Sequence, residues 1–454
     1  MEEKREKSVV SILVAFSLPL ILSGVLQQLY NWADAFIVGN VEGELALAAI
    51  GATGTIINFY ITVLVGFTTG LSILFAHKFG SGEREIIKKI LSTFLVLVGC
   101  VFLLATVLGE VFSLPMLRLL HTPQDIFRLA ADYLQIVLIG VPFLTIYNVY
   151  FSALRAVGDS KAPFWAILIS ALTNIGLDIL FVAIFRWSVA GAAAATVLSQ
   201  AAMAVFIVLY AVKKHELMRF KVGREMFDCK MLRAGLHMGI PPTVQSSVGA
   251  FGNLILQNFM NGFGTLTVAA ITTAYRVDTI ILLPIINLGS AISTMTAQAS
   301  GAGDRNRIRE FLKAGSALMI GVALLLTAII IPAGGHLISM FGVESEAVQI
   351  GSGFFRRIAC FYVIYGLAMV LRGGLEGIGD VTFSSLVGVV ALGARIIMSY
   401  TLVALWDNMV IAYAEGLSWV LLFFLYLFRF LVKRRDLGMV SENKAGSAGD
   451  HWTV

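Results

Sequence analysis

The sequence is poor in charged residues. Only 13% of its 454 residues are Asp, Glu, Lys or Arg, whereas 58% are hydrophobic. A soluble domain carries about 25% charged residues, and one soluble core could not hide this much apolar surface. The composition therefore argues against an ordinary soluble protein and indicates that lipid surrounds most of the chain.

Cysteine and proline are also scarce, at 3 and 9 residues. Cys100, Cys229 and Cys360 lie far apart, so the sequence offers neither a CxxC pair nor a disulfide framework. The histidines form no HExxH motif, and the glycine-rich turns match no phosphate-binding loop. We therefore expect no catalytic residues, no resident cofactor and no ATP hydrolysis.

About twelve apolar runs are long enough to cross a bilayer, which takes roughly 20 residues of helix. The first run follows a charged N-terminus and is too long for a signal peptide, so we expect it to be retained. We predict an all-α polytopic membrane protein of twelve transmembrane helices. The predicted spans are 11–38, 45–76, 90–113, 129–153, 162–185, 189–212, 234–260, 266–298, 312–334, 350–374, 382–405 and 409–431.

Two segments of the sequence recur 221 residues later: Gly80–Arg84 resembles Gly301–Arg305, and Leu154–Asp159 resembles Leu375–Asp380. An interval this long indicates a duplicated half-protein rather than a solenoid repeat. Each half holds six predicted spans, and an even number returns the chain to its starting side. The halves should therefore form two six-helix lobes related by a pseudo-twofold axis along the membrane normal, a parallel repeat.

Lys and Arg concentrate in the termini and in alternate loops. By the positive-inside rule both termini are then cytoplasmic, in a multi-pass protein of the inner, or cell, membrane. The net charge of +5 would anchor the chain to an anionic leaflet rather than bind nucleic acid. The predicted divisions are a first lobe (1–212), a cytoplasmic linker (213–233), a second lobe (234–432) and a cytoplasmic tail (433–454).

The first half contains acids within its apolar runs. Asp34 and Asp178 lie about 7–11 Å below the predicted outer boundary, at 1.5 Å per helical residue. Asn174 shares the helix face of Asp178, and Thr196 falls at a similar depth. A carboxylate inside a span costs about 2.5–3.5 kcal/mol on insertion scales, so such acids usually mark a function. We interpret these four residues as an ion-coupling site for H⁺ or Na⁺; the alternative is a wetted or helix-packing cluster.

The second half contains arginines instead. Arg395 occupies the position equivalent to Asn174, and Glu415 lies at a depth where it could neutralise it. Arg276 lies mid-span, with Asp278 two residues away. A structural Arg–Glu pair and a polar site for anionic or zwitterionic substrate groups both remain open. The candidate substrate-cavity residues are Tyr30, Asn31, Tyr147, Asn148, Tyr275, Arg276, Arg395 and Glu415.

Pro19 lies fifteen residues before Asp34 in the first span. A proline inside a helix removes a backbone hydrogen bond and bends the helix. A bend here could move Asp34 when its protonation changes, although many helix prolines are static.

Four segments together resemble the MATE family of multidrug and toxic compound extrusion transporters, prokaryotic type: Gln28–Gly39, Ala153–Asp159, Asn174–Asp178 and Val189–Gln200. The resemblance spans nearly the whole chain and implies twelve helices in two lobes. It also implies that Pro19 corresponds to the helix-1 bend of these members. The residues that correspond to their first-lobe cation or proton site are Asp34, Asn174, Asp178 and Thr196. The seventh span departs from members that carry acids in the second lobe, because it offers amides but no carboxylate.

From the residues and the resemblance we expect a secondary active efflux transporter. It would export amphipathic, cationic drugs or metabolites in exchange for H⁺ or Na⁺ by alternating access of two lobes. Its partners would be a small-molecule substrate and membrane lipid, without nucleic acid, and it would act as a monomer. The alternatives are a flippase for a lipid-linked anionic headgroup and an intramembrane enzyme, for which no His, Cys or Ser constellation is present.

Overall fold

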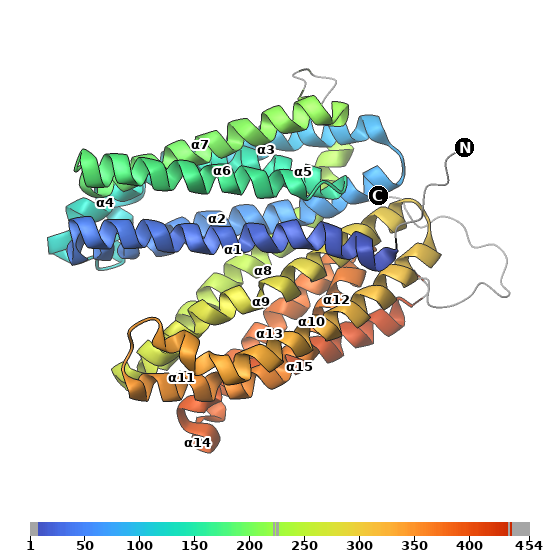
Figure 1. Ribbon diagram of the computed structural model, residues 1–454. Coiled ribbons are helices and arrows are strands. Elements are labelled where there is room, and N and C mark those ends of the chain that lie inside the picture. Colours follow the sequence, from blue (N-terminus) through green and yellow to red (C-terminus); the bar gives the residue numbers. More distant parts are fainter. Residues whose placement is uncertain (1–7, 221–222, 224–226, 435, 438–454) are drawn as a thin grey trace.

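The computed structural model describes residues 8–220, 223, 227–434 and 436–437. Over these residues the chain consists of helices joined by short turns, arranged as two bundles (Figure 1). The first bundle, or N-lobe, comprises α1 (Val9–Glu42), α2 (Glu44–Gly80), α3 (Arg84–Leu119), α4 (Gln124–Leu138), α5 (Val141–Ala156), α6 (Lys161–Asp178), η1 (Ile179–Ile184) and α7 (Ser188–Lys214), followed by η2 (Glu216–Met218). The second bundle, or C-lobe, comprises α8 (Cys229–Asn261), α9 (Gly264–Gly301), α10 (Arg305–Ser339), α11 (Ser345–Ile358), η4 (Ala359–Phe361), α12 (Tyr362–Gly377), α13 (Val381–Thr401), α14 (Val403–Trp406), η5 (Asp407–Met409) and α15 (Val410–Val432).

Every predicted span lies on one long helix or on consecutive helices. Within the described residues, ten helical segments are long and apolar enough to cross a membrane, and the bent pair α4–α5 makes an eleventh. The remaining predicted run, 234–260, lies on α8, which has 33 residues but carries two prolines and more polar side chains. The prediction of an all-α, multi-pass membrane protein is confirmed.

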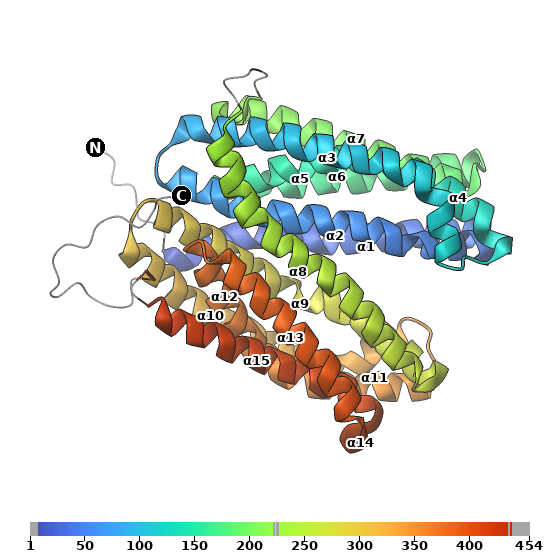
Figure 2. The same cartoon turned by 180° about the vertical axis from the view of Figure 1, so that it is seen from behind.

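The two bundles touch at one end of the molecule and diverge toward the other (Figures 1 and 2). We call the end where α1 begins and α15 ends the closed end, and the end that carries α4, α11 and α14 the open end. Between the bundles α2 packs along α8, and α1 packs along α9. The two pairings are equivalent under the repeat, as a pseudo-twofold axis between the lobes requires.

Glycine allows the long helices of different lobes to approach closely. A Cβ atom on Gly70 of α2 would lie 1.9 Å from the carbonyl oxygen of Met238 in α8, so only glycine fits there. Small residues at helix crossings are the usual means of close packing in membranes. Each bundle is filled by an apolar core, and both cores extend across the contact between the lobes. The C-lobe core takes in Leu13, Phe16 and Leu20 of α1, and the N-lobe core takes in Ala297 of α9 and Val381 of α13.

Candidate functional site

The acids of the first half gather toward the open end of the N-lobe, where α1 and α6 pack beside α7. Asp178 and Asn174 come from α6 and are fully buried, and Thr196 of α7 is 6% exposed. Asp34 reaches the same place from α1 and interacts electrostatically with Asp178. The side chains that the sequence placed at one depth therefore share one site.

The backbone beside Asp178 departs from regular α-helix. Asp178 is the last residue of α6, and the six residues that follow it form the π-helix η1. Single-turn π segments are rare and occur often at functional sites. The change from α-helix to π-helix alters the direction of the backbone next to Asp178, where this acid faces α1.

Two tyrosines complete this cluster. Tyr30 of α1 and Tyr133 of α4 both interact with Asp34 and Asp178 and lie beside Thr196. From the sequence we predicted Tyr30 only as a cavity residue, and we did not single out Tyr133. The available signal was its position near the outer end of the fourth predicted span, the same level as the acids.

Many polar atoms of the cluster are unsatisfied. Both carboxylate oxygens of Asp178, both amide atoms of Asn174, one oxygen of Asp34 and the hydroxyl of Thr196 are buried without a hydrogen-bond partner among the described residues. Buried polar groups normally have partners, because an unpaired one costs about 1–3 kcal/mol. A set of convergent unpaired oxygens is suited to a proton or a hard cation.

The C-lobe contains a separate cavity of about 450 Å³. Its polar wall is a network in which Arg395 donates to Glu415 at 3.0 Å and to the Tyr275 hydroxyl at 2.7 Å. Tyr275 in turn donates to Glu415 at 3.0 Å. Of the alternatives left open for Arg395, the structure shows the Arg–Glu pair, and it shows that the pair lines a cavity.

A further acid, Asp278 of α9, lines the same cavity. It is 3% exposed and accepts a hydrogen bond from Tyr362 of α12, not from Arg276. Residues two apart on a helix do not share a face, which accounts for the partner observed. The cavity wall thus carries two carboxyl groups against one guanidinium.

The other candidate residues lie elsewhere. Arg276 is exposed and outside this cavity. Tyr147 packs in the N-lobe core, stacked on Phe151 at 5.8 Å between ring centroids. Asn148 donates to the Leu144 carbonyl of its own helix, and Asn31 is exposed on α1.

Pro19 lies inside α1, which continues through it as one helix. The Ser23 hydroxyl donates to the Pro19 carbonyl at 2.7 Å, one turn further along. This is the bond that a helical serine commonly makes to the carbonyl four residues earlier, whereas the carbonyl that loses its amide donor to the proline is that of Ala15.

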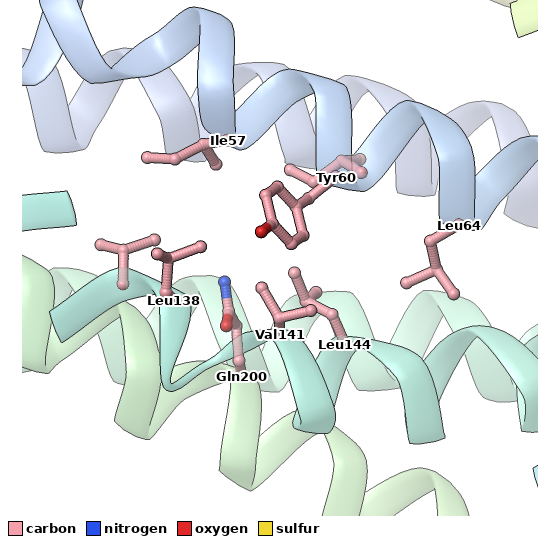
Figure 3. A pocket seen from close by; sticks show the side chains of 9 residues that line it. Ile57, Tyr60, Leu64, Leu138, Val141, Leu144 and Gln200 are labelled. Carbon is pink, nitrogen blue, oxygen red and sulfur yellow. The ribbon is translucent and has the colours of Figure 1, made fainter. Parts of the chain in front are cut away.

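A small cavity of about 20 Å³ lies beside the α4–α5 bend (Figure 3). The helices bend by 42° there, and Gln200 of α7 points into the cavity opposite Tyr60 of α2 (Figure 3). The volume suits a single water molecule and excludes a substrate. We therefore assign this cavity to the packing of the bend.

Comparison with known proteins agrees with this architecture. A family model described as MatE matches residues 19–180 and 241–401, one match in each lobe. The probable multidrug resistance protein YpnP of Bacillus subtilis (strain 168) is 31% identical, over 82% of this chain and 83% of its own. The probable multidrug resistance protein YoeA of the same strain is 27% identical, over 88% of each chain.

A solved structure described as the outward-facing conformation of a multidrug resistance MATE family transporter has a similar fold. It superposes with a TM-score of 0.87 at 20% sequence identity, covering 96% of this chain and 99% of that one. The family and the fold are those of transporters embedded in a membrane. This chain belongs to the MatE family of multidrug and toxic compound extrusion transporters.

Proposed function

We propose that this chain is a secondary active efflux transporter that exports amphipathic cationic drugs or metabolites in exchange for H⁺ or Na⁺. The observation that carries the proposal is the N-lobe cluster, whose buried oxygens on Asp34, Asp178 and Asn174 lack hydrogen-bond partners among the described residues. Two neighbouring buried carboxylates repel each other when both are ionised. Uptake of one cation relieves that repulsion, so the cluster is suited to bind the coupling ion.

Either ion fits the donor set. A proton can bind one carboxylate, and Na⁺ can be held by carboxylate, amide and hydroxyl oxygens, including that of Thr196. The ion is transported rather than resident, and we propose no cofactor.

The C-lobe cavity supports a cationic substrate. Its volume of about 450 Å³ lies in the range of small-molecule sites, and its wall combines aromatic and apolar side chains with a few polar groups. Glu415 already neutralises Arg395, which leaves Asp278 as the excess acid. The flippase alternative needs unpaired arginines for an anionic headgroup, and Arg395 is paired while Arg276 lies outside the cavity.

The cycle follows from the two lobes. We propose that both termini are cytoplasmic, that the open end faces outward, and that a single chain carries out transport. Ion binding to the N-lobe cluster removes charge from it and shifts the lobes toward the opposite opening, because the two arrangements hold the acids differently. One monovalent ion crossing about 150 mV supplies roughly 3.5 kcal/mol, enough for about a 300-fold gradient.

The test is transport of a fluorescent cation in proteoliposomes, with H⁺ and Na⁺ gradients imposed separately. We expect one gradient to drive transport in the wild type, and Asp34→Asn and Asp178→Asn to abolish the driven component. Asp125→Asn, which changes an exposed acid at the start of α4, is the matched control and should keep full activity. Full gradient-driven transport by the Asp34→Asn, Asp178→Asn double variant would refute the coupling role.

A further inference from the structure

The lobes meet at the closed end through two contacts that are related by the pseudo-twofold symmetry. There the C-terminal ends of α2 and α9 cross at Gly80 and Gly301, which are equivalent under the repeat. A Cβ atom on Gly80 would lie 2.0 Å from the carbonyl oxygen of Gln298. A Cβ atom on Gly301 would lie 2.0 Å from the carbonyl oxygen of His77. Glycine is therefore needed on both sides for the backbones to touch.

Two side chains at this crossing bridge the lobes. Gln298 of α9 donates from Nε2 to the carbonyl oxygen of Ala156, the last residue of α5, at 2.7 Å. The His77 ring of α2 lies against the backbone of Gly377, the last residue of α12, and its buried Nε2 has no other partner among the described residues. His77 is equivalent to Gln298, and Ala156 to Gly377, so the two contacts obey the pseudo-twofold symmetry.

The acceptors suit this role. Ala156 and Gly377 end their helices, and the last carbonyls of a helix lack partners within the helix. A donor from the opposite lobe satisfies one of them while the lobes touch. When the lobes part, water can take its place, so the bond can break and re-form in every cycle.

A buried charge pair lies beside the two contacts. Arg155 of the N-lobe and Glu376 of the C-lobe are 8% and 6% exposed, and they interact electrostatically across the interface. They also occupy equivalent positions in the repeat. Identical residues there would bring like charges together near the axis, whereas this chain places opposite charges. Arg372, at 2.6 Å, holds the Glu376 carboxylate in place.

We propose that His77 and Gln298 are a symmetric pair of gate residues for transport. Their contacts with Gly377 and Ala156 close one end of the molecule, and both must break whenever the transporter opens at that end. The inference rests on the proposed alternating-access function, and it assigns positioning residues that touch neither the acid cluster nor the C-lobe cavity.

The test measures the gate directly, without transport. Spin labels are attached at Leu119→Cys and Met340→Cys in a chain whose three native cysteines are replaced by serine. These two positions are equivalent in the repeat and are 77% and 72% exposed. Leu119 ends α3 and Met340 follows α10, both at the open end. Opening the closed end brings the open ends together, so the label distance reports the position of the lobes.

We expect His77→Ala and Gln298→Ala each to shift the ratio of short to long distances about 2- to 10-fold toward short, the effect of one lost hydrogen bond. The double variant should shift it further. His77→Gln is the matched control, because Gln298 already forms the equivalent bond, and it should restore the wild-type distribution. Gly80→Ala and Gly301→Ala should shift it in the same direction as the alanine variants.

An unchanged distance distribution in both single alanine variants and in the double variant would overturn the proposal. So would a shift in His77→Gln as large as that in His77→Ala. Should the proposed efflux function be wrong, transport would fail in the wild type while the distances still respond, so the two failures are distinguishable.

Discussion

At the scale of single residues, the Arg395–Glu415 pair shows how the C-lobe can hold a buried charge. The two side chains are 16% and 10% exposed, and Tyr275 bonds to both. Removing one partner of a buried pair leaves the other charge uncompensated, which costs about 3–5 kcal/mol. Replacing both partners by neutral groups costs much less.

We therefore predict that Glu415→Gln lowers the thermal unfolding temperature far more than the Arg395→Met, Glu415→Gln double variant. The measurement is thermal unfolding of the purified protein in detergent, combined as a double-mutant cycle. Equal destabilisation by the single and the double variant would show that the pair contributes no net coupling.

Asp159 links the α5–α6 turn to the end of α7 at the closed end. It lies in the turn between α5 and α6 and accepts hydrogen bonds from Lys214 at 2.9 Å, Tyr210 at 3.0 Å and His215 at 3.1 Å. Burial alone would raise the pKa of Asp159, but the hydrogen bonds from Lys214 and His215 outweigh it and hold the pKa below its usual value. The folded state therefore favours the ionised carboxylate.

This direction fixes the sign of a pH effect. A depressed folded pKa adds stability above the unfolded value of about 3.9, and that stability is lost as the pH falls through the folded value. We predict that Asp159→Asn destabilises the protein by about 1.5–3 kcal/mol at pH 7. The difference should begin to shrink near about pH 4 and disappear only below the depressed pKa of the folded state. Unfolding temperatures of both proteins across this pH range provide the test, and a difference that persists at low pH would contradict it.

At the scale of elements, the packing of α2 on α8 depends on glycine. A Cβ on Gly70 would overlap the Met238 carbonyl, whereas Gly54 on the same helix has open space around its Cβ position. Overpacking at such a contact costs about 1–3 kcal/mol, while Gly→Ala at an unhindered helix position gains up to about 1 kcal/mol.

We thus expect Gly70→Ala to lower the unfolding temperature and Gly54→Ala to leave it unchanged or raise it. Both variants are measured in the same detergent. Equal effects would mean that α8 can move away from α2 without loss.

At the scale of the whole molecule, the proposed ion-coupling cluster and the proposed gate lie at different levels of the two-lobe structure. Asp34 and Asp178 lie toward the open end, and the crossing of α2 and α9 lies at the closed end. Coupling between them requires that neutralising the acids changes the balance between the two lobe arrangements.

The Asp34→Asn, Asp178→Asn variant imitates the neutralised cluster. We predict that it shifts the Leu119–Met340 label distances toward short values by about 5- to 150-fold in population, the usual range of coupling. A distribution identical to that of the wild type would separate ion binding from lobe movement.

The sequence alone determined the architecture and located the acids. Long apolar runs, the 221-residue repeat and acids in otherwise apolar spans were sufficient, because lipid imposes helices of fixed length and makes each buried charge conspicuous. It also placed Asn174, Asp178 and Thr196 at one depth, since depth follows from counting residues along a helix.

Which side chains meet depends on the assembled fold. It joined Tyr133 to the acids, paired Asp278 with Tyr362, left Arg276 exposed, and set His77 and Gln298 opposite the ends of α12 and α5. The physical reason lies in the solvent. A helix in lipid is apolar on every side, so no periodicity in the sequence reveals which face turns toward a neighbour. That rotation is set by close packing at glycines such as Gly70, Gly80 and Gly301, which appears only when the helices are assembled.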